Sequence, residues 1–146
     1  MPLTDQQLAF LANTHSAAMI TLRKDGTPHA VRVGVALVDG KIWSSGVPSR
    51  LRTGHLRRDP RSTLFVFDTS FNFLTIEATV TIHDGPDAAE MNLRLFQQMQ
   101  QSVARPEGTL LWYGQPKSLD DFLQTMKDEQ RLIYEFAPTR AYGLSA

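Results

Sequence analysis

The chain has 146 residues and a formal net charge of zero, which argues against a generally basic nucleic-acid-binding protein. Its length fits one domain over residues 1–146, and its hydrophobic content of 42% is too high for wholesale disorder. There is no cysteine, which excludes disulfides and thiolate metal sites.

The first part of the chain predicts one helix and three strands. Thr4 and Gln7 have the spacing of a capping box, so a helix is expected to begin there and to end near residue 13. Strands are predicted over residues 17–23, 29–38 and 41–46, separated by two Asp-Gly turns. In the second of these strands apolar and other residues alternate, which places Arg32 on the face opposite the valines.

The rest of the chain predicts three helices and three strands. A short helix opens at Pro48-Ser49 and ends before Pro60, because the residue before a proline avoids helical backbone. The following elements are strands over 62–68 and 73–83, a helix from 84 to about 103, a loop over 104–117, a helix capped by Ser118 that ends near 130, and a strand over 131–137. About six short antiparallel strands with flanking helices predict a mainly β fold, a small β-barrel, since closing a sheet removes its exposed edges.

The segment over residues 44–61 has the pattern of an anion site. Arg50 and Arg52 fall in the first turn of a helix that Ser49 is expected to cap, where a cation is unfavourable by ~0.3–1 kcal/mol and an anion is favourable. We interpret Arg50, Arg52 and Thr53, with Ser45 and Ser49, as a phosphate cradle. Spacing alone leaves two alternatives open, a solvated helix whose arginines pair with surface carboxylates and a local nucleic-acid patch, which the neutral net charge disfavours.

Other polar and aromatic residues give weaker signals. Glu77 lies mid-strand among threonines, which favours a cross-strand ion pair with an arginine over a general acid. Trp112, Tyr113 and Phe71 could line a substrate mouth, although packing is the more common role of such aromatics. The four histidines show no metal-ligand spacing, so no metal site is expected. No apolar run approaches the ~20 residues that span a bilayer and no signal peptide is apparent, so we expect a cytoplasmic protein with no membrane partner.

Several motifs resemble the pyridoxamine 5′-phosphate oxidase-like flavin-binding split-barrel family. The strongest is Leu-Arg-Arg-Asp-Pro-Arg at residues 56–61, and the hairpin at 21–29, the start at 10–12 and the end at 141–144 are similar too. The resemblance covers essentially the whole chain. Within the family, the chain is most similar to short actinobacterial enzymes that use the deazaflavin coenzyme F420.

This resemblance implies an FMN-binding split barrel and assigns site residues. Arg52 stands where family members hold the cofactor phosphate with a cation, and Thr53 follows it in the matching place. The strand after the hairpin would run beside the cofactor ring, which makes neighbours of Pro28, His29, Ala30, Val31 and Arg32. His55, another candidate neighbour, and Gly54 stand where members usually have asparagine and arginine, so the choice between F420 and FMN stays open.

The resemblance also implies a reaction and an assembly. The expected protein is a homodimer with the cofactor between subunits, which transfers a hydride from reduced F420 to a small electron-poor substrate such as an enone or a tetrapyrrole. The alternatives are an FMN-dependent oxidase or reductase, a non-catalytic carrier of flavin or deazaflavin, and a haem-binding protein with His29 or His55 as ligand.

Overall fold

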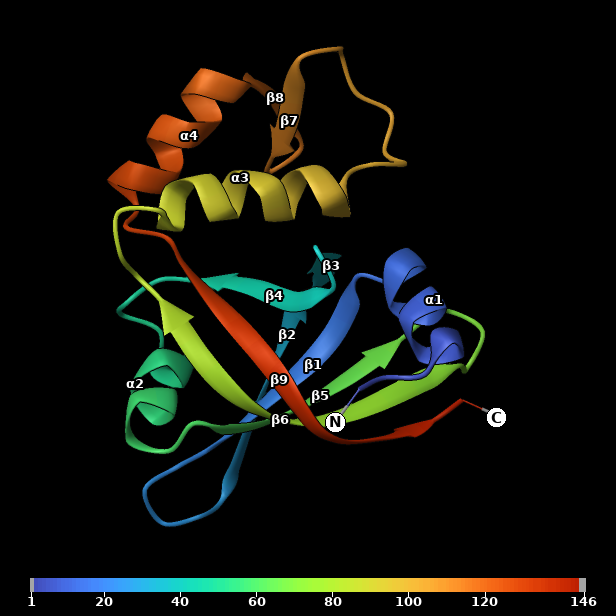
Figure 1. Ribbon diagram of the computed structural model, residues 1–146. Helices are drawn as coiled ribbons and strands as arrows, with labels where there is room; N and C mark the ends of the chain where they lie inside the picture. The colour runs from blue at the N-terminus through green and yellow to red at the C-terminus, as the bar shows by residue number, and fades with distance from the viewer. Residues whose placement is uncertain (1, 145–146) are drawn as a thin grey trace.

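A curled antiparallel sheet with helices at its margins dominates the computed structural model, which describes residues 2–144 (Figure 1). Seven strands form this sheet in the order β2-β1-β5-β6-β9-β4-β3. Their bounds are β1 Ser16–Leu22, β2 Pro28–Gly34, β3 Ala36–Val38, β4 Lys41–Gly46, β5 Arg61–Phe67, β6 Phe73–His83 and β9 Leu132–Gly143. The end of β2 meets β4 across the curl, where Ser44 Oγ donates to the Gly34 carbonyl at 2.7 Å. The sheet is thus a half-barrel, and the expected mainly β split-barrel fold is confirmed.

The structure has nine strands within residues 2–144, which is more than the six expected. The predicted strand over 29–38 is two strands, because the Val35 N–H donates to the His15 carbonyl and the chain then leaves β1 to pair β3 with β4. The predicted loop over 104–117 contains most of a hairpin, β7 (Thr109–Trp112) and β8 (Gln115–Ser118). Its turn residues Tyr113 and Gly114 both have positive φ, which suits a tight hairpin but is uncommon for tyrosine.

The last strand also runs further than the sequence predicts. β9 was expected to end at residue 137, before Pro138, yet it continues to Gly143. A bulge at Thr139 lets it pass the proline, since Ala78 of β6 pairs with Pro138 and Glu77 pairs with Arg140.

Four helices flank the sheet: α1 Asp5–Asn13, α2 Leu51–Arg58, α3 Ala88–Met99 and α4 Leu119–Asp128. The capping box at Thr4 and Gln7 and the Ser118 cap are both present, as predicted. α3 ends at Met99, earlier than the expected residue 103. In Figure 1, α3, α4 and the β7–β8 hairpin gather above β3 and β4 as a separate group. No helix within residues 2–144 has the length and apolar character needed to cross a lipid bilayer.

Within the described residues, three apolar clusters support the fold: one inside the half-barrel, one between the helices and the hairpin, and one between α3 and the sheet. The half-barrel core includes the inward face of β6, where Leu74, Ile76, Ala78 and Val80 are buried as the alternation predicts. A second core lies between the helices and the hairpin and is formed by Ala89, Leu110, Phe122 and Met126. The third cluster, which includes Trp43, Leu95 and Ile133, packs α3 onto the sheet, so apolar contacts join the two parts.

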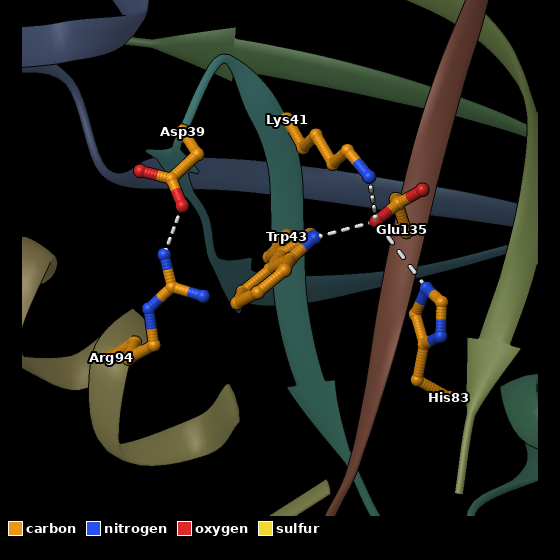
Figure 2. Close-up of polar contacts among 6 residues, drawn as sticks. All are labelled: Asp39, Lys41, Trp43, His83, Arg94 and Glu135. Carbon is orange, nitrogen blue, oxygen red and sulfur yellow. Dashed lines mark hydrogen bonds and ion pairs between the residues drawn. The ribbon is translucent and has the colours of Figure 1, made fainter. Parts of the chain in front are cut away.

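A polar cluster ties α3 to the sheet (Figure 2). On neighbouring strands, the Trp43 Nε1–H donates to Glu135 Oε1 at 2.9 Å, and the same oxygen lies 3.3 Å from His83 Nε2 and 3.9 Å from Lys41 Nζ. From α3, Arg94 pairs with Asp39 and lies over the Trp43 ring, 5.5 Å from its centroid. These contacts fix the helix that carries part of the candidate site.

Candidate functional site

A cavity of about 480 Å³ lies between the ends of β2 and β4, the start of α2, and the group formed by α3 and β7. We call it the arginine cavity, because four guanidinium groups line it: Arg32, Arg50, Arg52 and Arg131. Its apolar wall comes from α3 and the hairpin and contains Phe96, Met99, Leu111, Trp112 and Tyr113. No acidic side chain of the described part of the chain is in the lining.

Most of this positive charge is not neutralised by the protein. Arg131 Nη2 lies 2.8 Å from Glu129 Oε1, and its guanidinium lies over the Trp112 ring at 5.0 Å from the centroid. The other three arginines make no ion pair with any residue in 2–144. A cavity lined by uncompensated cations is electrostatically suited to an anionic ligand.

Arg52 is the most desolvated of the three unpaired cations. Its Nη2 donates to the Ser45 carbonyl at 3.4 Å, and its guanidinium lies 5.6 Å from the centroid of the buried Tyr134 ring. Its Nε is buried and has no hydrogen-bond partner in the described chain. Burial lowers the pKa of Arg52, Tyr134 opposes this, and the charges of Arg50 and Arg131 add to the lowering. An anion in the cavity would supply the missing partner.

The start of α2 adds backbone donors to the same region. Arg50 is the N-cap residue, Arg52 lies in the first turn, and no side chain caps this end. The prediction that Ser49 caps the helix is therefore wrong. Ser49 is exposed and lies outside the arginine cavity.

The hydroxyls expected in the phosphate cradle are engaged by the protein itself. Thr53 is fully buried, its Oγ1 donates to the Val47 carbonyl at 2.8 Å, and it contacts the Tyr134 hydroxyl at 2.5 Å. Ser45 lines the cavity, but its proton is donated to Asn92. Both hydroxyls therefore donate within the protein in this structure, and their contact with a phosphate stays a prediction.

The first half of β2 lies apart from the arginine cavity. Pro28, His29, Ala30 and Val31 are not in its lining, and neither is His55; only Arg32 of the expected ring neighbours is. The rings of His29 and His55 meet edge to face at 5.1 Å, and His55 Nδ1 lies 2.9 Å from Thr21 Oγ1. Burial, then the nearby His29 and two arginines, lower the pKa of His55 and favour its neutral form. Contact of these five residues with a cofactor stays a prediction.

Comparison with known proteins identifies the family. The family model described as pyridoxamine 5′-phosphate oxidase matches residues 3–144. The chain belongs to the pyridoxamine 5′-phosphate oxidase family. Members of this family are largely oxidoreductases that use flavins, so the arginine cavity lies in a fold associated with flavin-type redox chemistry.

Solved structures with the same fold carry different descriptions. A conserved hypothetical protein from Mycobacterium tuberculosis is 19% identical, with a TM-score of 0.72 over 98% of this chain and 85% of its own. An F420 reductase is 18% identical, with a TM-score of 0.67 over 97% and 98%. A heme binding protein from Mycobacterium smegmatis is 12% identical, with a TM-score of 0.63, and the match covers 99% of this chain and 55% of that protein. At these identities the likeness is one of fold.

Two further residues of the site, Arg131 and Asn92, were not predicted, because no sequence motif marks them. Arg131 reaches the cavity because Gln130, with a φ of 53°, reverses the chain between α4 and β9. Asn92 is fully buried on α3 and contacts the cavity wall through Ser45. By contrast, the predicted ion pair of Glu77 with an arginine is confirmed, since Arg140 Nη1 lies 3.9 Å from its carboxylate. No cluster of three potential metal ligands occurs within residues 2–144.

Proposed function

We propose that this protein is an oxidoreductase that uses reduced coenzyme F420 to transfer a hydride to a small electron-poor organic substrate, such as an enone or a tetrapyrrole. The observation that carries the proposal is the arginine cavity, with three guanidinium groups that lack an acidic partner in residues 2–144. Family membership and the fold shared with an F420 reductase support it. The bound cofactor would supply the hydride chemistry, which accounts for a site without a nucleophile.

In this proposal the protein's own residues would bind and orient the cofactor and shield it from water. Arg50 and Arg52 would hold the cofactor phosphate through charge-assisted hydrogen bonds, and the unpartnered Nε of Arg52 fits this role. Trp112 and Tyr113 would cover the reacting face and exclude water, because both line the arginine cavity on its apolar wall. Solvent or the Tyr113 hydroxyl would supply a proton to the substrate.

FMN is the second candidate cofactor, favoured by the match to a flavin-using family. Both cofactors carry a phosphate, so the arginines do not distinguish them. Titrating the purified protein with each and following quenching of cofactor fluorescence separates the two. We expect F420 to bind more tightly and its reduced form to be oxidised when an enone is added. Tight binding of FMN alone would replace the first proposal with the second, and F420 binding without turnover of any acceptor would indicate a carrier.

We also propose that two copies associate and that the cofactor lies between them. Exposed aromatics on the outer face of the half-barrel support this: Phe65 and Phe73 stack at 5.2 Å, and Tyr142 is 49% exposed. Arg32, Ala18 and Phe65 are register partners across β2, β1 and β5. A partner that covers the aromatics would therefore lie beside Arg32 and could close the arginine cavity.

A further inference from the structure

The polarity of one hydroxyl in the arginine cavity is determined by its neighbour. Ser45 Oγ lies 2.5 Å from Oδ1 of Asn92, which is fully buried. An amide oxygen carries no hydrogen, so the serine is the donor in this contact. The single hydroxyl proton of Ser45 therefore points away from the cavity, towards α3.

The orientation of the Asn92 amide is itself fixed by two carbonyl groups. Its Nδ2 donates to the Ala88 carbonyl at 2.9 Å and to the Leu132 carbonyl at 3.4 Å. A flipped amide would place its oxygen against both carbonyl oxygens, an unfavourable contact that gives the buried amide oxygen no donor there. Both carbonyls belong to regular elements, the start of α3 and the start of β9, so the arrangement is built into the backbone.

Ser45 Oγ is therefore a hydrogen-bond acceptor in a cavity whose other polar side chains are mainly donors. Ser44, the other serine in the lining, is buried and also donates inward, to the Gly34 carbonyl at 2.7 Å. The third hydroxyl in the lining is that of Tyr113, whose side chain is 82% exposed. The four arginines and Trp112 can only donate. Ser45 is partly exposed, and its oxygen accepts no hydrogen bond from the described protein.

We propose that Ser45 accepts a hydrogen bond from the bound cofactor, and that Asn92 is the positioning residue that enforces this polarity. The cofactor group at the β4 wall then carries an N–H or O–H donor, while its anionic group faces the arginines. A deprotonated oxygen at this point would face the serine lone pairs and is disfavoured, so Ser45 contributes specificity. The inference rests on the proposed function. Both F420 and FMN offer two such donors, the ring lactam N–H and the side-chain hydroxyls.

A double-mutant cycle with cofactor analogues tests the proposal. The ligands are whichever of F420 and FMN binds, an analogue methylated at the lactam nitrogen, and an analogue with an alkyl phosphate chain that lacks hydroxyls. In the wild-type protein one analogue should bind about threefold to tenfold more weakly than the cofactor, the scale of one hydrogen bond. In Ser45→Ala the affinity for the cofactor should fall by the same factor, and the affinity for that analogue should not fall further. The analogue affected identifies which donor Ser45 contacts.

Two controls make the outcome decisive. Ser45→Ala leaves the buried Asn92 amide oxygen without a partner, and this variant could fail to fold. In that case the double variant Ser45→Ala/Asn92→Leu, which replaces both polar groups, should show the same loss of cofactor affinity. Unchanged cofactor affinity in these variants, or an equal loss for all three ligands, overturns the inference. If Arg52→Ala still weakens binding in that case, only the inference fails; if Arg52→Ala is also without effect, the proposed function fails with it.

Discussion

Arg52 is a half-buried cation whose buried Nε has no partner in the described chain, so its removal should directly weaken the binding of an anion in the cavity. We expect Arg52→Ala to weaken cofactor binding by about 1.5–3 kcal/mol, the range for a charge-assisted hydrogen bond. Arg57→Ala is the matched control, because Arg57 lies on the same helix but pairs with Asp84 at 3.0 Å. Glu77→Gln should also leave affinity nearly unchanged. Fluorescence titrations that rank these variants in the reverse order would mean that the site lies elsewhere.

Asp59 predicts a pH dependence of stability. Its carboxylate accepts hydrogen bonds from Arg61 Nε at 3.1 Å and Nη2 at 2.8 Å, and these lower its pKa from 3.8 to about 2. Because the folded-state pKa lies below the ordinary value, the ionised carboxylate stabilises the fold above about pH 4, and this contribution is lost as the pH falls towards 2. Asp59→Asn should therefore lower the urea midpoint at pH 7 and make a smaller difference near pH 2. A difference independent of pH would contradict this account.

At the level of single residues, the sequence predicts residue types and local spacing but not the direction of a hydrogen bond. Arg50 and Arg52 are two residues apart, a spacing that does not place side chains on one helix face; both line the cavity in a structure where Arg50 is the extended N-cap residue and Arg52 lies in the first turn. Thr53 has the same local signal, yet its hydroxyl is used to satisfy the Val47 carbonyl and the Tyr134 hydroxyl, which lies far along the chain. Only tertiary structure determines such a partner.

The junction between β4 and α2 depends on a glycine. A Cβ at Gly46 would overlap the Tyr134 ring, which lies beneath Arg52, whereas a Cβ at Gly54 on α2 would meet nothing within 4 Å. Gly46→Ala should lower the free energy of unfolding by about 1–3 kcal/mol through overpacking. Gly54→Ala should raise it by about 0.5–1 kcal/mol, because alanine favours a helix. Urea unfolding of both variants measures this, and equal effects would refute the packing argument.

Elements with strong periodicity were predictable, and elements set by unusual backbone were not. The bounds of β4 and β6 match the predicted ones, because alternation and turn residues mark both. The hairpin β7–β8 was missed since its turn has Tyr113 at positive φ rather than an Asn-Gly pair. The tail of β9 was missed because the bulge at Thr139 depends on pairing with β6.

For the whole molecule, the exposed aromatics on the outer face predict self-association. The wild-type chain, of 16.4 kDa, should sediment as a dimer of twice that mass. Phe65→Glu should shift it to monomer, because a charge would be buried against the partner's apolar surface. Val103→Glu, at a residue 43% exposed beyond α3, is the control and should remain dimeric. A wild-type monomer at micromolar concentration would contradict the proposed assembly, and unchanged dimerisation of Phe65→Glu would exclude this face.

The hairpin and the half-barrel contribute to different apolar clusters, and this has a consequence for how the site can vary. The arginines other than Arg131 are carried by the half-barrel, whereas Trp112 and Tyr113 belong to a hairpin that packs on the second core. Under the proposed function, substitutions at Tyr113 in the hairpin turn would alter the apolar wall that faces a substrate while leaving Arg32, Arg50 and Arg52 in place to bind the cofactor.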